Sequence, residues 1–317
     1  MVKIAQIHPG CGISVPPPSW GAIEKIVWEF IINLRKLGHQ VDLKWTNEVK
    51  SGEYDLVMVH VANLALELAN KGIPYIFQHH DHHAFYYSKN SEVYKQNREA
   101  MEKSVFSLVP ARYLVDYFDL PNVYYFSHGI NNEEFYPIDK PKPTEPKLLM
   151  IANNGLAGDP GFDRKGFTYG IALAQARNLP ITIVGPSNNK HFFNNHLWVL
   201  AYPKLNIIFD LPNEQLLNLY HQHDIFVHPT MLEAGHPNLT MLEAVAAGLP
   251  IIANWEHETT FHGAWRSPRD VFEMSKGLDD IMNNWGSYRT KCSETAKELS
   301  WYNRSKELIK LYERHFN

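Results

Sequence analysis

Short apolar runs alternate with amphipathic helical patterns along almost the whole chain. The clearest helical pattern, at 21–37, places Ile23, Val27 and Phe30 on one face, and Gly38 ends it. Short apolar runs predict buried strands at 2–7, 41–45, 56–60, 75–78, 106–109 and 123–126. Strands that alternate with helices in this way are typical of βαβ units and parallel sheets.

A proline-rich segment divides the chain. Residues 137–146 contain four prolines, which lack a backbone donor and disfavour helix in the residue before them, so we expect a stiff linker. Beyond it we predict strands at 148–152, 181–184, 207–209, 225–228 and 251–253, and helices at 167–177 and 237–247. We therefore expect an α/β fold of two Rossmann-like, doubly wound domains, 1–136 and 147–300, that face each other across a ligand-binding cleft.

Composition excludes several classes of protein. A chain of 317 residues with 44% hydrophobic and 20% charged residues can bury two cores, and its net charge of −4 gives no chain-wide attraction to nucleic acid or anionic lipid. Cys11 and Cys292 are too few for a disulfide scaffold and too far apart for a metal pair. The chain starts without a secretion signal and has no apolar run of membrane-spanning length, so we expect a cytoplasmic protein.

Two loops that lead into helices could bind a phosphate. The loop 8–21 contains three glycines and four prolines and delivers the chain to a helix start, where N–H groups attract anions. The loop 153–166 ends in Asp163-Arg164-Lys165-Gly166, and two cations beside a helix start are unfavourable unless an anion binds there. Neither loop carries a dinucleotide fingerprint or a Walker A motif, so a rigid turn and a solvated pair of cations stay open as alternatives.

Carboxylates and imidazoles add further candidates. Glu233 follows the predicted strand 225–228 and Glu243 lies in the next helix, where carboxylates can accept hydrogen bonds from sugar or ribose hydroxyls; Glu243 could equally be a surface residue. Residues 78–83 read Gln-His-His-Asp-His-His after another strand. Adjacent residues on one loop rarely converge on one ion, so we expect a single histidine that faces the cleft as a hydrogen-bond donor or acid, and no metal site.

The ordered combination of motifs resembles retaining glycosyltransferase family 4, whose fold is GT-B. The matching segments are 16–24 (Pro-Pro-Pro-Ser-Trp-Gly-Ala-Ile-Glu), 38–41 (Gly-His-Gln-Val), 128–131 (His-Gly-Ile-Asn), 135–137 (Phe-Tyr-Pro), 165–166 (Lys-Gly), 183–185 (Ile-Val-Gly) and 243–250 (Glu-Ala-Val-Ala-Ala-Gly-Leu-Pro). The resemblance implies transfer of a sugar from a UDP- or GDP-type nucleoside diphosphate sugar to a hydroxyl acceptor. It also implies retention of anomeric configuration, no cofactor and no obligatory metal.

The resemblance implies roles for individual residues. Gly21 and Ala22 would approach the donor phosphates, and Lys165, with Arg164 beside it, would neutralise the leaving diphosphate. His80 and Glu233 would face the donor sugar and would be catalytic together with Lys165, whereas Glu243 would hold the ribose. The other donor-binding positions would be Gly235, His236, Pro237, Asn238, Leu239 and Thr240. Residues 301–317 would form a helix that crosses back to the first domain.

The chain departs from the family pattern at three points. Nine residues separate Glu233 from Glu243 where the family has seven, which indicates either a two-residue insertion or a different matched carboxylate. Ala22 replaces the second glycine of the entry loop, and Arg164 substitutes for an arginine that usually lies a few residues earlier. A catalytically inactive, nucleotide-sugar-binding regulator on the same fold is therefore the alternative function.

The acceptor is expected to be a glycan or a lipid-linked glycan. A hydroxymethylated base of phage-type DNA is the second option, for which Lys89, Lys95, Arg98 and Lys103 supply local positive charge. The inner face of a membrane and the cytoplasm of an infected host are the corresponding alternative locations. A nucleotide-sugar epimerase is disfavoured, because segments 16–24 and 248–250 resemble the transferases.

Overall fold

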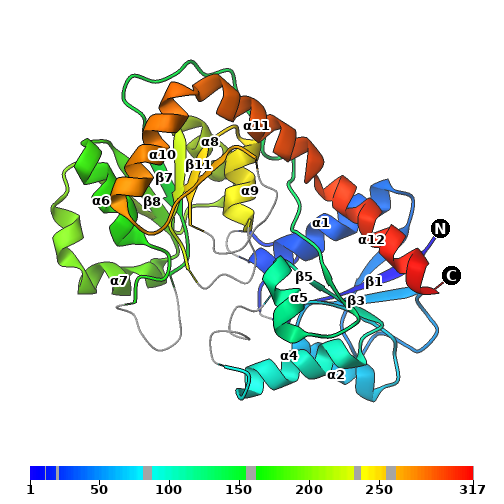
Figure 1. Cartoon of the computed structure of the whole chain (residues 1–317). Coiled ribbons are helices and arrows are strands. Elements are labelled where there is room, and N and C mark those ends of the chain that lie inside the picture. Colours follow the sequence, from blue (N-terminus) through cyan, green and yellow to red (C-terminus); the bar gives the residue numbers. More distant parts are fainter. Residues whose placement is uncertain are drawn as a thin grey trace.

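The computed structural model describes residues 1–10, 12–18, 21–80, 88–154, 162–231, 237–254 and 262–316. Its strands form two six-stranded sheets in separate lobes, which are joined by the segment between β6 (Val123–Tyr125) and β7 (Leu148–Ile151) (Figure 1). That segment contains only turns and one isolated bridge. The predicted α/β architecture of two parallel sheets is confirmed.

The N-terminal sheet has the strand order β2-β1-β3-β4-β5-β6, and its neighbouring strands pair in parallel. Its strands before β6 are β1 (Lys3–Ile7), β2 (Gln40–Lys44), β3 (Leu56–Val59), β4 (Ile76–Gln78) and β5 (Phe106–Val109), and its helices are α1 (Ala22–Lys36), α2 (Ala62–Asn70), α4 (Glu92–Lys103) and α5 (Arg112–Phe118). Each predicted strand is confirmed to within one residue at its ends. The chain moves from β1 to β2 on one side and then returns to β3 on the other.

The C-terminal sheet has the order β12-β11-β10-β7-β8-β9, again in parallel. Its strands after β7 are β8 (Ile181–Gly185), β9 (Leu205–Phe209), β10 (Ile225–His228), β11 (Ile251–Ala253) and β12 (Ala264–Arg266). Its helices are α6 (Phe167–Arg177), α7 (Lys190–Asn195), α8 (Leu216–Gln222), α9 (Leu239–Ala246), α10 (Val271–Asn283) and α11 (Trp285–Glu298), with 3₁₀ turns η1 (Ser187–Asn189), η2 (Leu197–Ala201) and η3 (Asn213–Gln215). The sequence did not predict β12, because its three residues, two half-buried and one exposed, form no apolar run and only pairing with β11 makes them a strand.

The last helix, α12 (Trp301–Phe316), lies against α1 of the N-terminal lobe (Figure 1). Trp301 and Leu308 are buried in the core that surrounds Phe30. The Trp301 ring approaches Gly129 so closely that a Cβ at that position would lie 2.5 Å from it, which explains the glycine of the 128–131 motif. The backbone N–H of Trp301 donates to the carbonyl of Ile130 at 3.0 Å, which fixes the start of the helix.

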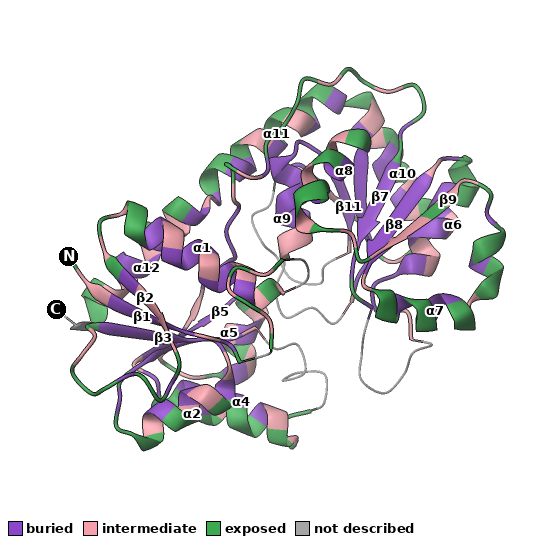
Figure 2. Ribbon diagram, turned by 180° about the vertical axis from the view of Figure 1, so that it is seen from behind, coloured by how far each residue is buried: buried purple, intermediate pink, exposed green. Residues whose placement is uncertain are grey.

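The burial pattern follows from the two-layer covering of each sheet. Figure 2 shows strands that are mostly buried and helices that have one buried and one exposed face. Parallel strands covered on both faces carry near-continuous apolar runs, which is why the sequence predicts them well. None of the helices in the described part of the chain combines the length and the apolar character that crossing a membrane requires.

Candidate functional site

Each sheet has a point where the direction of winding changes, and loops diverge there. In the N-terminal sheet this point lies between β1 and β3, and in the C-terminal sheet between β7 and β10. Ligands of open α/β sheets bind beyond the carboxyl ends of the strands at such points. Among the described residues, Gly21, His60 and Lys165 lie in the loops that follow β1, β3 and β7. The strand order therefore predicts a ligand-binding site formed by residues of these loops.

The segment before α6 fixes Lys165 in a buried position, with 7% of its surface exposed. Its backbone N–H donates to Oδ1 of Asn154 at 3.0 Å, and the Asn154 N–H donates to Oδ1 of Asn189 at 2.9 Å. A Cβ at Gly185 would lie 2.0 Å from the Asn189 amide, so the glycine of the Ile-Val-Gly motif admits this side chain. Arg164 is also buried, and its guanidinium donates to the carbonyl of Asn153 at 3.0 Å.

The start of α6 is capped by a carboxylate of the protein. Oδ1 and Oδ2 of Asp163 accept hydrogen bonds from the backbone N–H groups of Phe167 and Thr168 at 2.8 and 2.9 Å. The argument that the neighbouring cations need an external anion at this helix start was therefore wrong, because Asp163 already satisfies the helix dipole. Gly166 has φ +74°, and a Cβ there would lie 2.2 Å from the carbonyl oxygen of Pro229. Only glycine fits this close approach between the loops after β7 and β10.

Gly21 immediately precedes α1, and Ala22 is its exposed first residue. Gly21 has φ +149°, and a Cβ there would lie 2.9 Å from both Oε2 of Glu24 and Cβ of Pro17. Glu24 is 2% exposed, and no described residue hydrogen-bonds its Oε1. An anion near this loop must therefore lie on the side away from the Glu24 carboxylate.

The start of α9 is held by its own cap and by β10. The side chain of Asn238 accepts from the Met241 N–H at 3.1 Å, and its amide lies 2.7 Å from Nε2 of His228. Pro237 is buried directly before this cap, and Leu239 and Thr240 begin the helix half-buried. These positions lie together at one helix start, as their adjacency in sequence requires.

Glu243 does not lie on the surface. It is 9% exposed, and its Oε1 forms an ion pair with Nζ of Lys25 at 2.8 Å, which joins α9 of one lobe to α1 of the other. The Tyr220 hydroxyl donates to Oε2 of Glu243 at 3.0 Å. The surface alternative for Glu243 was wrong. Protein groups already contact both carboxylate oxygens, although each oxygen has a second lone pair for a ligand hydroxyl.

The ion pair belongs to a larger set of charges between the lobes. Burial by itself lowers the pKa of Lys25, but Glu243 and Glu134 outweigh that effect, and the pKa lies above its usual value. Burial raises the pKa of Glu29 to about 7, against the opposing effects of a hydrogen bond from Asn131 and the charge of Lys25. The Asn131 amide donates to Oε1 of Glu29 at 2.7 Å, so the asparagine of the 128–131 motif positions this carboxyl group.

Three histidines gather at the carboxyl end of the N-terminal sheet, where the sequence predicted one. Nδ1 of His60 lies 3.1 Å from Nε2 of His80, and the rings of His80 and His128 are nearly parallel with centroids 5.6 Å apart. Burial lowers the pKa of His60 to about 3 and that of His128 to about 4. Burial and the neighbouring imidazoles hold the pKa of His80 well below its usual value, so it is neutral at pH 7 and the expected acid role is not supported.

Several sequence-predicted residues cannot be placed. Glu233, Gly235 and His236 lie outside the described residues, as do His82 and His83. In the ranges that the structure does describe, no three His, Cys, Asp or Glu side chains are arranged to hold a metal ion.

Sequence reasoning missed Lys25, Tyr220, His60 and Gln6 as members of the site. Only His60 had a usable signal, because it is a polar residue that directly follows an apolar strand.

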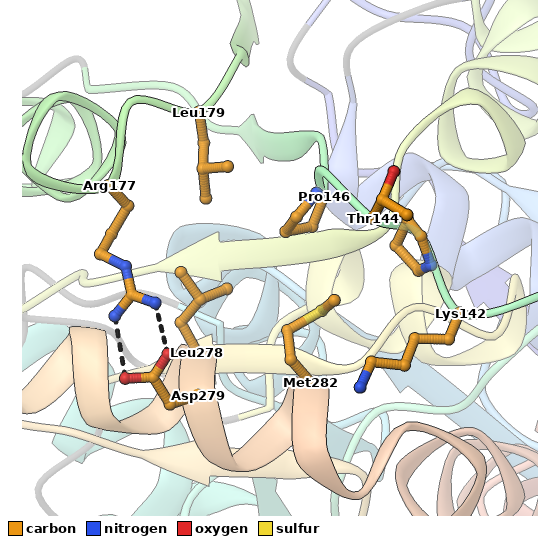
Figure 3. A pocket seen from close by; sticks show the side chains of 9 residues that line it. Lys142, Thr144, Pro146, Arg177, Leu179, Leu278, Asp279 and Met282 are labelled. Atoms are coloured by element: carbon orange, nitrogen blue, oxygen red, sulfur yellow. Dashed lines mark hydrogen bonds and ion pairs between the residues drawn. The ribbon is translucent and has the colours of Figure 1, made fainter.

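A separate hollow of about 460 Å³ lies between the proline-rich segment, the end of α6 and α10 (Figure 3). Pro146 and Leu179 line it and lie two residues before β7 and β8, so the hollow is at the amino ends of these strands. Its Arg177 is bound by Asp279, with Nη1 donating to Oδ2 at 2.9 Å. This hollow is therefore on the opposite edge of the sheet from the candidate site.

Comparisons with known proteins agree with this geometry. Residues 162–299 match the family model described as glycosyl transferases group 1. A search of curated protein sequences found no match.

Solved structures match over the whole chain. Sucrose-phosphate synthase from Thermosynechococcus elongatus aligns with TM-score 0.76 and 15% identity over 100% of this chain and 99% of that one. AviGT4, a glycosyltransferase involved in avilamycin A biosynthesis, gives 0.71 and 15% over 99% and 98%, and Anabaena HepE in complex with UDP-glucose gives 0.72 and 11% over 99% and 100%. At these identities the likeness establishes the fold, which is GT-B.

Proposed function

We propose that this chain is a retaining glycosyltransferase that transfers a sugar from a nucleoside diphosphate sugar to a hydroxyl acceptor without an obligatory metal. The observation that carries the proposal is the family match at 162–299, since this segment contains Lys165, Asn238 and Glu243 beside the switch point of the C-terminal sheet. A UDP- or GDP-type donor fits the proposal. The HepE structure that shares this fold contains UDP-glucose.

The proposed reaction places its main electrostatic demand on the leaving group. The bond from the anomeric carbon to the diphosphate oxygen breaks, a bond to the acceptor oxygen forms, and the proton of the acceptor hydroxyl passes to the departing diphosphate. The departing diphosphate gains negative charge, which the buried ammonium of Lys165 would stabilise, with Arg164 beside it. Backbone groups of Gly21 and Ala22 would approach the same phosphates from the other lobe.

The remaining donor contacts are proposed from their positions. Glu243 would hold the ribose hydroxyls with the lone pairs that Lys25 and Tyr220 leave available. His80 and Glu233 would face the donor sugar. The positions proposed to complete the donor site are Gly235, His236, Pro237, Asn238, Leu239 and Thr240.

A glycan fits the acceptor side better than DNA. Trp45 follows β2 with 49% of its surface exposed and stacks on His8 at a centroid distance of 4.3 Å, so an indole held in place is available to the apolar face of a sugar ring. Three of the four basic residues that could favour DNA pair with a glutamate on α4: Lys95 with Glu92, Arg98 with Glu102 and Lys103 with Glu99, at 2.6–2.9 Å. The fourth, Lys89, lies over the ring of Tyr117 at 4.8 Å. The glutamates beside these cations lower the net positive charge that the helix presents to phosphates.

Nucleotide binding is the first test of the proposed function. UDP or GDP at 100 times its Kd should raise the free energy of unfolding by about 2.7 kcal/mol, and EDTA should not change this. Differential scanning fluorimetry with UDP, GDP and ADP, with and without chelator, measures the effect. No shift with any of the three, or a shift that chelator abolishes, would contradict the proposal.

Contacts to Glu243 favour one second candidate, a nucleotide-sugar-binding regulator without catalysis. Lys25 and Tyr220 occupy the carboxylate in this structure, and such a bound arrangement could exclude a productive donor. Donor turnover measured with a panel of glycan acceptors separates the two functions, since a regulator would bind the nucleotide sugar and leave it intact.

Glu243→Gln should weaken nucleotide binding about tenfold, because ribose hydroxyls would lose a charged acceptor. Isothermal titration calorimetry with UDP and GDP gives the affinity. The matched control is Glu134→Gln, since Glu134 also lies near Lys25, at 3.7 Å, but belongs to the other lobe and is not proposed to touch the donor. Equal losses in both variants would mean that Glu243 acts only through Lys25.

A further inference from the structure

A chain of three polar side chains crosses the carboxyl ends of adjacent strands in the N-terminal sheet. Gln6 lies in β1, His60 directly follows β3, and His80 lies two residues after β4. Oε1 of Gln6 is 2.9 Å from Nε2 of His60, and Nδ1 of His60 is 3.1 Å from Nε2 of His80. We name this Gln6–His60–His80 chain the relay. Gln6 is fully buried and His60 is 3% exposed, so the protein and not solvent determines their protons.

The orientation of the Gln6 amide determines which atoms of the relay donate and which accept. Its Nε2 donates to Sδ of Met58 at 3.2 Å, and Met58 is the residue paired with Gln6 between β1 and β3. A thioether sulfur can only accept, so the amide nitrogen faces Met58 and the amide oxygen faces His60. Nε2 of His60 must therefore carry the proton that it donates to Gln6.

The same logic continues along the chain. A buried, neutral His60 with its proton on Nε2 has a lone pair on Nδ1, so it accepts from Nε2–H of His80. A neutral His80 with its proton on Nε2 then has a lone pair on Nδ1. That Nδ1 atom is buried, and no described residue hydrogen-bonds it. A buried acceptor without a partner is costly, and in a native protein it calls for a ligand or an ordered water.

We propose that Gln6 and His60 are positioning residues that fix the tautomer of His80, so that its Nδ1 accepts a hydrogen bond from a hydroxyl group of the bound sugar. This inference rests on the proposed function, because the hydroxyl is that of the transferred sugar. It assigns His80 as an acceptor, whereas the sequence favoured a donor or an acid. His128 lies against His80 with nearly parallel rings and limits its rotation. The relay also explains why a polar glutamine occupies a fully buried position in strand β1.

The tautomer can be tested without any activity. In protein labelled with ¹⁵N-histidine, NMR should show the proton of neutral His80 on Nε2 and Nδ1 without a proton. Gln6→Leu removes the acceptor for His60 and should populate the opposite tautomer of both histidines. His60→Asn keeps an amide oxygen near the Nδ1 position and should preserve the His80 signals. A proton on Nδ1 of His80 in the unchanged protein would overturn the proposal, whether or not the protein transfers sugar.

The ligand part of the proposal has its own measurement. Replacing each hydroxyl of the donor sugar in turn by fluorine, which cannot donate, should lower kcat/KM about threefold to tenfold at one position. In Gln6→Leu this discrimination should shrink, and in His60→Asn it should persist. The control is Thr182→Val, which removes the 2.9 Å partner of the buried His223 in the other lobe and should leave the discrimination unchanged. If fluorination lowers kcat/KM by the same factors in Gln6→Leu as in the unchanged protein, the relay has no role in sugar recognition. Nucleotide binding without turnover would refute only the proposed transferase activity.

Discussion

Lys165→Ala should lower kcat about 100-fold while nucleotide binding falls less. The ammonium of Lys165 is buried in a segment fixed by Asn154 and Asn189, so it is already in place when the diphosphate charge develops. Loss of one preorganised group that faces developing charge costs about 100-fold or more in rate. Steady-state kinetics with a saturating nucleotide sugar and an acceptor that supports turnover measure the effect. Lys165→Met, which keeps the apolar stem, should show the same loss and so separates charge from packing.

Lys204→Ala is the matched control for the loss of a lysine in the same lobe. Lys204 pairs with Glu145 at 2.8 Å before β9, at the amino edge of the sheet, so kcat should not change. Arg164→Ala should reduce kcat less than Lys165→Ala and lower stability more, because the guanidinium holds the carbonyl of Asn153. Similar small losses of kcat at Lys165, Arg164 and Lys204 would show that this segment does not contact the leaving group.

Acid should unfold the protein because its buried histidines resist protonation. Well above pH 6.5 these imidazoles are neutral in both states. As pH falls through 6.5, the unfolded chain binds protons that the folded chain excludes until about pH 3 at His60 and about pH 4 at His128. These histidines therefore lower the free energy of unfolding as pH decreases from 6.5. Since one pKa unit corresponds to about 1.4 kcal/mol, His60 alone accounts for a loss of about 3 kcal/mol between pH 6.5 and pH 4. Urea denaturation at a series of pH values between 7.5 and 4 gives the slope.

Glu29 acts in the opposite sense over part of this range. Its pKa of about 7 lies above the ordinary 4.5, so the folded state retains a proton that the unfolded state releases, and this group favours folding as pH falls from 7 to 4.5. A comparison of variants isolates the histidine contribution. His60→Asn should flatten the decline below pH 6.5, and His191→Gln, on the exposed face of α7, should not. An unchanged slope in His60→Asn would mean that His60 is not held neutral.

The strands and the main helices were predictable because each is encoded locally. A strand buried on both faces needs an apolar run, and α1 needs apolar residues at helical spacing; neither depends on distant residues. The glycines of the motifs are required by tertiary contacts, which cannot be identified from the sequence. Gly129 is required by Trp301 and Gly166 by Pro229, contacts that join segments far apart in the chain.

The candidate site was predictable only in part. Lys165 lies in a loop at the switch point of a sheet, which the order of strands and helices alone suggests. Asp163 beside it could not be identified as a helix cap, because a carboxylate before a helix can equally point away.

By itself the sequence determined most of the strands, the main helices and the division into two parallel sheets, since burial of apolar runs is a local requirement. Only the tertiary structure decided that Glu243 pairs with Lys25, 218 positions away, and that Gln6 in β1 forms a relay with His60 after β3 and His80 after β4. The sequence does not show which partner a polar side chain will contact in the folded protein. Its charge, pKa and proton position arise from burial and from neighbours that come together only when the sheets assemble.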